Sequence, residues 1–318
     1  MQSFQYTDNY TDTHTVFNQI LEIVVKLYKK CIPATIKNRK NVDKLVQPDT
    51  VIIACVLWGI MLGYNSQRAT YRAVRTILFF NEFPSRTRYT RFCASLTYAI
   101  KIIRFFFVKQ KTKNVMKAIV DSFPSPFCKK IRNRRAKVLG SIAEIGYNST
   151  KEMYYYGVKI SAAVTESDFP IAYVVSSSKI HDVQLLETLV NEAPIPNILG
   201  DRGYISGSIQ EKIARKGVTV TTPLRKNMKD TDKINDTLLG RRRKKIEIVF
   251  SSLEKLEIQD FSRDESRLES ILLVYCLMLD KARERFGNTL KLFFRMILNQ
   301  LAPQIIYAVK ALNCTLYS

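Results

Sequence analysis

The stretch around Asp201 places a carboxylate directly after a short apolar run. Pro196 to Leu199 forms that run, and Gly203 allows a sharp backbone turn behind the acid. A helix-like segment, Ser206 to Arg215, then leads to a second apolar run, Val218 to Thr222. In open α/β sheets, ligands bind beyond the carboxyl ends of strands. The pattern therefore predicts strand, acid, helix and strand, with Asp201 as a site residue, although an aspartate here could also simply start a loop.

A second acid stands alone in a basic region. Between Phe83 and Ala143 there are fifteen Lys and Arg residues and one carboxylate, Asp121. It follows a mostly apolar run, Val115 to Val120, and precedes Ser122-Phe-Pro, which suggests that a strand ends there. Asp121 is thus predicted at the carboxyl end of a strand, as an ion-pair partner or as a residue kept for its chemistry.

The middle of the chain predicts a hairpin. Tyr154 to Val164 alternates with period 2, which is a strong strand signal, and Pro170 to Ser176 continues it as an antiparallel partner. His181-Asp182 precedes a predicted helix, Val183 to Val190. Asp182 is most simply the N-cap of that helix, with a direct role in catalysis as the alternative.

A third candidate acid lies on a helix predicted from about Leu238 to Leu256. Apolar residues recur along it at helical spacing: Ile246, Val249, Phe250, Leu253 and Leu256. Glu247 flanks this stripe and could point along the contact with the sheet. The alternative is an ordinary surface pair with Arg243 one turn before it.

Composition indicates the kind of partner. The net charge of +22 and pI near 9.7 favour a polyanion, either nucleic acid or an anionic membrane surface. Two histidines and six scattered cysteines without a Cys-x-x-Cys pair argue against a zinc site and suit a reduced, intracellular compartment. No signal peptide is visible, and the longest apolar run, Val51 to Tyr64, is short for a membrane span and predicts a core helix.

The order of the elements predicts an α/β protein with a ribonuclease H-like mixed sheet flanked by helices, preceded by a helical domain. In that fold Asp121, Asp201 and Glu247 would converge. Three close carboxylates repel one another unless cations lie between them, and carboxylate oxygens suit two Mg²⁺ or Mn²⁺ ions. The expected domains are residues 1–112, helical and either DNA-binding or a bundle with a basic surface; 113–262, catalytic; and 263–318, helices packed on the catalytic domain.

A family resemblance rests on an ordered set of short motifs. They are Phe79-Phe-Asn-Glu-Phe-Pro84 with Arg86-Thr-Arg88, Val120-Asp-Ser-Phe-Pro124 with Cys128, Gly146-Tyr-Asn-Ser-Thr-Lys151, Tyr156-Gly-Val-Lys159, His181-Asp182, Gly200-Asp-Arg-Gly-Tyr204, Thr222-Pro-Leu-Arg225 with Asn227-Met-Lys229, and Arg242-Arg-Lys-Lys-Ile-Glu247-Ile-Val-Phe-Ser251. Together they cover about residues 75 to 255. The chain resembles the bacterial insertion-sequence transposases of the DDE type, most closely the insertion-sequence 982 group.

The resemblance implies that Asp121, Asp201 and Glu247 bind the metal ions, and that the protein cleaves element ends and transfers the 3′-hydroxyl to target DNA. Gly240 stands where relatives have Tyr, Glu254 beside Lys255 where they have Lys, and Ser161 where many have His. The basic residues expected to hold the DNA backbone are Lys129, Lys130, Arg132, Arg134, Arg135, Lys159, Arg202, Arg225, Arg242 and Arg243.

The expected partners are the terminal inverted repeats of the element and its target DNA, bound by a homo-oligomer assembled on paired ends in the bacterial cytoplasm at the nucleoid, with no membrane contact. Two other functions fit the same charge. One is a transposase-derived DNA-binding protein that no longer cuts, and the other is a nuclease of the same fold that cuts without joining.

Overall fold

A computed structural model describes most of the chain. The described residues are 8–78, 80–112, 114–130, 139, 141–148, 152–193, 195–224, 237–260 and 265–286. The chain divides into two compact units, one formed by residues 1–107 together with 264–318 and the other by residues 108–263. Each unit is described by itself.

The first unit is helical. Its helices are α1 (Asp8–Cys31), α2 (Ala34–Lys37), α3 (Asp49–Met61), α4 (Gln67–Ile77), α5 (Arg86–Ser95), α6 (Thr97–Lys111, which continues into the second unit) and α11 (Glu265–Phe286). The centre is α3, which is apolar all round after its first turn and packs against α1, α4, α5 and α11. This confirms the predicted core helix, and no described helix has the length and apolar character that crossing a bilayer requires.

Two features of the helical unit differ from the sequence expectation. The residues from about Tyr89 to Val108, where basic residues stand among Phe and Tyr, predict one helix by themselves. The structure forms two, α5 and α6, separated at Leu96. The segment expected to pack on the catalytic domain contributes α11 to the helical unit instead. Buried Glu269 of α11 pairs with buried Arg104 of α6, so a long-range ion pair fixes this placement. Residues 287–318 lie outside the described residues.

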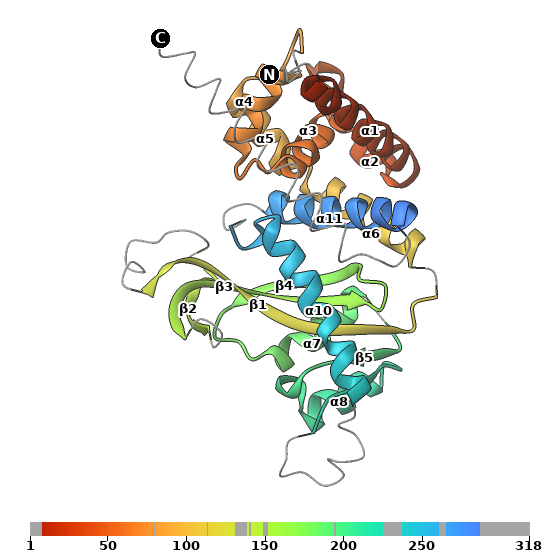
Figure 1. Cartoon of the computed structure of the whole chain (residues 1–318), viewed down its shortest axis with the longest axis vertical. Helices are drawn as coiled ribbons and strands as arrows, with labels where there is room; N and C mark the ends of the chain where they lie inside the picture. Colours follow the sequence, from red (N-terminus) through yellow and green to blue (C-terminus); the bar gives the residue numbers. More distant parts are fainter. Residues whose placement is uncertain are drawn as a thin grey trace, which may run out of the picture. The chain divides into compact units, whose positions relative to one another are not determined.

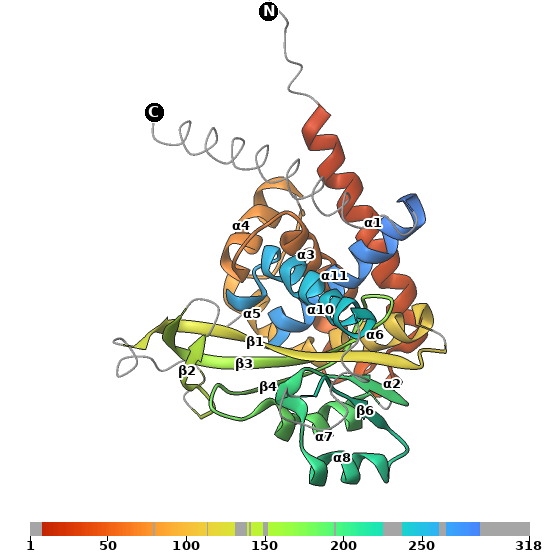
Figure 2. The same ribbon diagram turned by 60° about the horizontal axis from the view of Figure 1, so that its bottom comes forward.

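The second unit is a six-stranded mixed sheet with helices on both faces (Figures 1 and 2). Its elements are β1 (Lys117–Lys129), β2 (Glu144–Asn148), β3 (Met153–Thr165), β4 (Pro170–Ser177), α7 (Asp182–Glu192), β5 (Asn197–Leu199), α8 (Gly207–Ala214), β6 (Thr219–Thr221) and α10 (Thr237–Lys255). Strand β1 pairs antiparallel with β3 and parallel with β5, β3 pairs antiparallel with β4, and β5 pairs parallel with β6. This arrangement confirms the predicted ribonuclease H-like fold class.

Strand β1 continues past the point where the sequence suggested its end. It runs eight residues beyond Asp121 and passes through Pro124 and Pro126 while paired with β3. The prediction that Asp121 ends its strand was therefore wrong. Proline, which lacks a backbone donor, is tolerated on a strand with a free edge, and β5 pairs only with residues 117–119 of β1. The register also shifts between Pro126 and Cys128.

The two faces of β1 are covered by different helices, as its contacts show. The Phe123 ring packs on Phe250 of α10 at a centroid distance of 4.6 Å, whereas Ser122 Oγ donates a hydrogen bond to Asp182 of α7. Side chains alternate between the faces of a strand, so Asp121 shares its face with Phe123 and hence with α10.

Candidate active site

The register of β1 and β5 relates Asp121 to Asp201. The parallel ladder pairs Lys117 with Asn197 and ends with Ile119 opposite Leu199. Asp121 lies two residues beyond Ile119, and Asp201 lies two residues beyond Leu199. The two acids therefore occupy equivalent positions on neighbouring parallel strands, past the end of β5, and both side chains are half-buried.

The backbone holds the carboxylates of both acids. Asp121 Oδ1 accepts a hydrogen bond of 2.8 Å from the N–H of Ser122. Asp201 caps the 3₁₀ helix Arg202–Tyr204, and its Oδ1 accepts a bond of 2.7 Å from the N–H of Gly203. Each aspartate thus has one oxygen engaged in fixing its side chain.

The sequence predicted that Gly203 allows a sharp backbone turn. In the structure its φ is not positive, and a glycine is needed there because a side chain would not fit. Among the described glycines only Gly63 and Gly217 have positive φ. A Cβ on Gly203 would lie 2.9 Å from Asp201 Oδ1 and 3.8 Å from Asp182 Oδ2. Two carboxylates therefore approach the same point, and a side chain there would press directly on one of them.

Helix α10 lies along strand β1, and successive residues of the helix meet successive residues of the strand. Lys245 of α10 lines a cavity together with Ile119, and Phe250 of α10 packs on Phe123. Beyond the end of the helix, the carbonyl of Gln259 accepts from Ser125 Oγ at 2.7 Å. In the sequence of β1, Asp121 stands between Ile119 and Phe123. In the sequence of α10, Glu247 stands between Lys245 and Phe250. Glu247 is exposed and flanks the buried residues Ile246 and Val249.

Asp182 is a fourth acid beside these positions, and sequence reasoning assigned it a different role. The structure places it as the first residue of α7, with His181 at the cap position, so the N-cap prediction was wrong. Its Oδ1 accepts from Ser122 Oγ at 2.7 Å and lies 2.6 Å from Lys159 Nζ. Ser122 thus joins Asp182 to the backbone that holds Asp121.

The buried hydroxyl of Tyr204 is influenced by the charges of three aspartates. Its side chain is fully buried, and its hydroxyl has no hydrogen-bond partner within the described part of the chain. Burial raises the pKa of this phenol well above its usual value, and the charges of Asp182, Asp121 and Asp201 raise it further. The three carboxylates therefore lie within electrostatic range of one hydroxyl.

The donor set suits a hard divalent cation. Carboxylate oxygens are what Mg²⁺ and Mn²⁺ prefer, and the residues that meet here are aspartates with a serine hydroxyl. Over the described residues, however, no three His, Cys, Asp or Glu side chains are grouped closely enough to enclose an ion. Asp121 and Asp201 are the best-matched pair of candidate ligands, since equivalent positions of two paired strands carry them.

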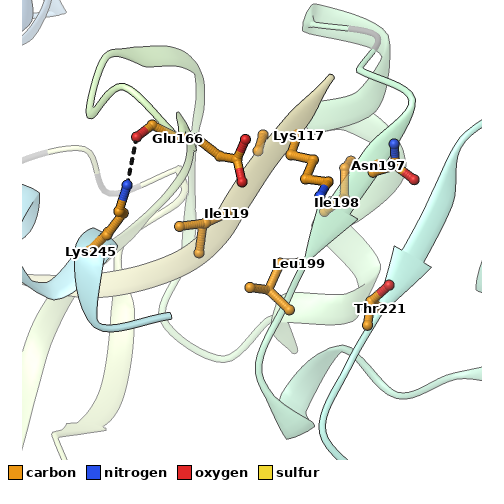
Figure 3. Close-up of a pocket in the computed structure, with 9 residues that line it drawn as sticks. Lys117, Ile119, Glu166, Asn197, Ile198, Leu199, Thr221 and Lys245 are labelled. Atoms are coloured by element: carbon orange, nitrogen blue, oxygen red, sulfur yellow. Dashed lines mark hydrogen bonds between the residues drawn. The ribbon is translucent and has the colours of Figure 1, made fainter. Parts of the chain in front are cut away.

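A cavity of about 180 Å³ is lined by residues of β1 and β5 and by Lys245 of α10 (Figure 3). Its floor is apolar and includes Ile119 and Leu199, each two residues before a candidate acid. Lys117 and Lys245 contribute cationic groups to its lining, and Lys245 Nζ donates to the carbonyl of Glu166. The sequence analysis did not select either lysine; its only signal for Lys245 was the basic run before Glu247.

The residues expected to contact DNA are distributed unevenly. Lys129, Lys130 and Arg202 are exposed. Lys159 is only 16% exposed, and its ammonium binds Asp182 and the carbonyl of Ile180. Its charge is therefore engaged within the protein, beside the candidate site. The remaining positions lie outside the described residues or have side chains that are not described: Arg132, Arg134, Arg135, Arg225, Arg242 and Arg243.

A comparison with protein-family models matches the unit that carries the candidate site. Residues 111–267 match the family model of the transposase DDE domain, a segment that contains all three predicted metal ligands. The match supports a transposase of the DDE type. Among solved structures, the chain is similar to a piggyBac transposase in a synaptic complex with hairpin DNA, at 10% identity and a TM-score of 0.39, covering 93% of this chain and 81% of that one. A comparison with curated protein sequences gave no match.

Proposed function

We propose that this protein is a DNA transposase that cuts the ends of a mobile element and joins the 3′-hydroxyl to target DNA. Asp121, Asp201 and Glu247 are the proposed ligands of Mg²⁺ or Mn²⁺. The observation that carries the proposal is the shared register of Asp121 and Asp201 past the end of β5. For Glu247 the support is indirect: Phe250, three residues after it, packs on Phe123, two residues after Asp121. The match of residues 111–267 to the transposase DDE domain supports it.

Each part of the site has a defined role in this proposal. When bound, two divalent ions activate a water or a 3′-hydroxyl and stabilise the leaving oxygen in an in-line displacement at phosphorus. The backbone N–H groups of Ser122 and Gly203 hold the two aspartates in position. Exposed Arg202, next to Asp201, binds a phosphate of the DNA strand, with Lys129, Lys130 and the basic residues outside the described ranges along the rest of the backbone.

Finer features rest on the motif resemblance. They are membership of the insertion-sequence 982 group, a bacterial cytoplasmic setting at the nucleoid, and a homo-oligomer assembled on paired terminal repeats. The mass of the protein bound to one or two end fragments, measured by light scattering, tests the last of these. A single protomer on each fragment at all concentrations would contradict it.

A strand-transfer assay tests the function. Purified protein is mixed with a labelled duplex of the sequence flanking its gene and a plasmid target, with Mg²⁺, Mn²⁺ or EDTA. We expect joined product with either metal and none with EDTA. Asp121→Asn, Asp201→Asn and Glu247→Gln should each abolish cutting while DNA binding is largely retained. Glu187→Gln is the matched control, because Glu187 is a carboxylate of the same unit that pairs with Lys212 and Lys216.

The outcomes separate the alternatives. Cutting without joining would indicate a nuclease of this fold, and tight end binding with neither reaction would indicate a DNA-binding protein that has lost catalysis. Near-normal cutting by any one of the three variants would remove that residue from the proposed set of ligands.

A further inference from the structure

The β2–β3 hairpin carries two exposed tyrosines side by side. Tyr147 and Tyr154 are paired across the hairpin, with ring centroids 5.0 Å apart and planes inclined by 55°. They are 54% and 56% exposed, whereas the next residue, Tyr155, is only 4% exposed. Large aromatic side chains normally contribute by being buried, so this exposed pair forms an uncovered aromatic surface. The strand β2 that carries Tyr147 is at the edge of the sheet away from β5 (Figure 1).

The hairpin is held in place by contacts that do not involve these two rings. Ser178 Oγ makes hydrogen bonds to the carbonyls of Glu144 and Gly157, at 3.2 and 2.7 Å. Gly146 approaches Ser178 so closely that a Cβ on the glycine would lie 2.5 Å from the serine Cβ. The hairpin is therefore anchored at its base by contacts that do not need the two exposed rings.

Cationic groups accompany the rings. Lys130 Nζ lies 4.8 Å from the centroid of the Tyr154 ring, and Lys129 beside it is also exposed. The segment that follows, residues 131–137, adds four more basic residues to the sequence. A partner that offers flat π-faces together with regularly spaced negative charge matches this surface, and nucleic acid has both.

We propose that Tyr147 and Tyr154 form a stacking platform for unpaired nucleotides of the bound DNA, with Lys130 at the adjoining phosphate. Unpaired bases can present their faces to a side chain, whereas the bases inside a duplex are covered on both faces by their neighbours. Lys129 is opposite Tyr155 in the β1–β3 ladder and eight residues from Asp121. The platform thus lies about 26 Å along the strand from the acids, beyond the point of cutting. The inference rests on the proposed function for its DNA partner.

The competing explanation is that the pair only stabilises the two-stranded ribbon, as cross-strand aromatic pairs do. The two explanations predict different effects when the rings of Tyr147 and Tyr154 are removed. Stabilisation of the ribbon affects the melting temperature whether or not DNA is present, whereas a platform affects the binding of unpaired bases and leaves duplex binding nearly unchanged.

The test compares two labelled probes by fluorescence anisotropy, an oligothymidylate and a blunt duplex of mixed sequence. Replacing both Tyr147 and Tyr154 with Ala should weaken oligothymidylate binding about tenfold, the effect of losing roughly one stacked base. Duplex binding should change less than twofold. The double Tyr→Phe variant keeps both rings and should bind like the wild type. Met116→Ala is the control, since Met116 is a large apolar residue of the same unit that is 57% exposed.

A second measurement needs no variant. Bromodeoxyuridine placed in the oligothymidylate is cross-linked to the wild-type protein by ultraviolet light, and the modified residue is identified by mass spectrometry. Cross-links at Tyr147 or Tyr154 are expected; their absence, or oligothymidylate binding that withstands the double Ala substitution, would overturn the platform. Failure of strand transfer with these cross-links present would reject the proposed transposase and leave the platform standing.

Discussion

Asp182 Oδ1 and Lys159 Nζ lie 2.6 Å apart, and this ion pair joins the start of α7 to the middle of β3. The same carboxylate oxygen accepts from Ser122 Oγ. Three elements that are distant in the sequence therefore meet at one half-buried carboxylate, next to both predicted catalytic aspartates. The pair explains why a lysine expected to contact DNA is turned into the protein.

Removal of this carboxylate should destabilise the fold. Asp182→Ala leaves the Lys159 ammonium, 16% exposed, without its ion-pair partner, and we expect a loss of about 1–3 kcal/mol in the free energy of unfolding. Ser122→Ala removes only the hydrogen bond from the hydroxyl to this carboxylate, leaves the ion pair in place, and is the milder control. Urea unfolding of Asp182→Ala, Lys159→Met and the double variant gives the coupling energy. Additive losses would show that the pair contributes nothing to stability.

Gly203→Ala should reduce activity with little change in fold. The new methyl group would press on Asp201 Oδ1 at 2.9 Å, so the carboxylate must turn away from its backbone donor. We expect at least a tenfold fall in strand transfer, because small displacements at a reacting centre are costly. Gly207→Ala is the matched control, as nothing lies within 4 Å of its Cβ position. Equal activity of the two variants would contradict the close approach at Gly203.

Divalent metal should stabilise the protein in a way that depends on the aspartates. Mg²⁺ or Mn²⁺ bound only to the folded state raises stability by about 2.7 kcal/mol at a hundredfold excess over its dissociation constant. The melting temperature of the wild type should therefore rise with metal and fall back with EDTA. Asp121→Asn and Asp201→Asn should lose this response, and Glu187→Gln should keep it. A response unchanged in both Asn variants would place the metal elsewhere.

The buried pair of Arg104 and Glu269 should be sensitive to removal of one partner. Arg104 is 2% exposed and Glu269 is fully buried, with Nε and Oε2 2.6 Å apart. Arg104→Met removes the cation that pairs with a buried carboxylate and should cost about 3–5 kcal/mol. The exposed pair of Glu22 and Lys26 is the control, where solvent screens both charges and Glu22→Ala should have a far smaller effect. Similar losses at both sites, measured by urea unfolding, would argue against burial of Arg104 and Glu269.

Alkaline pH should weaken the helical unit through Cys276. Burial raises the pKa of this thiol to about 12, while a thiol in an unfolded chain titrates near 8.5. Above about pH 8.5 the unfolded state releases the proton first, so stability falls as pH rises towards 12. Cys276→Ala should flatten this part of the pH profile of unfolding. An unchanged difference between the two proteins from pH 8 to 11 would contradict the burial of this group.

Elements with a clear local pattern could be predicted. The alternation from Tyr154 to Val164 appears as β3, and the apolar stripe from Ile246 to Leu256 appears as α10. The acids Asp121 and Asp201 were selected because each follows an apolar run. Local periodicity decides such features, since it reports which face of an element can be buried.

Features that depend on pairing between distant residues could not be predicted. Strand β1 continues past Asp121 because β3 supplies a partner for residues that contain two prolines. Strand β2 is short and is defined by its pairing with β3. The role of Asp182 changed because Ser122 and Lys159 lie beside it only in the folded chain.

The sequence by itself determined the order and type of the main elements, the ribonuclease H-like fold class and the acids worth testing. The tertiary structure decided the register that aligns Asp121 with Asp201, the cavity lined by β1, β5 and Lys245, and the helical unit to which α11 belongs. The physical reason is that propensity and periodicity act over a few residues, whereas strand register and buried ion pairs join residues such as Arg104 and Glu269, 165 positions apart.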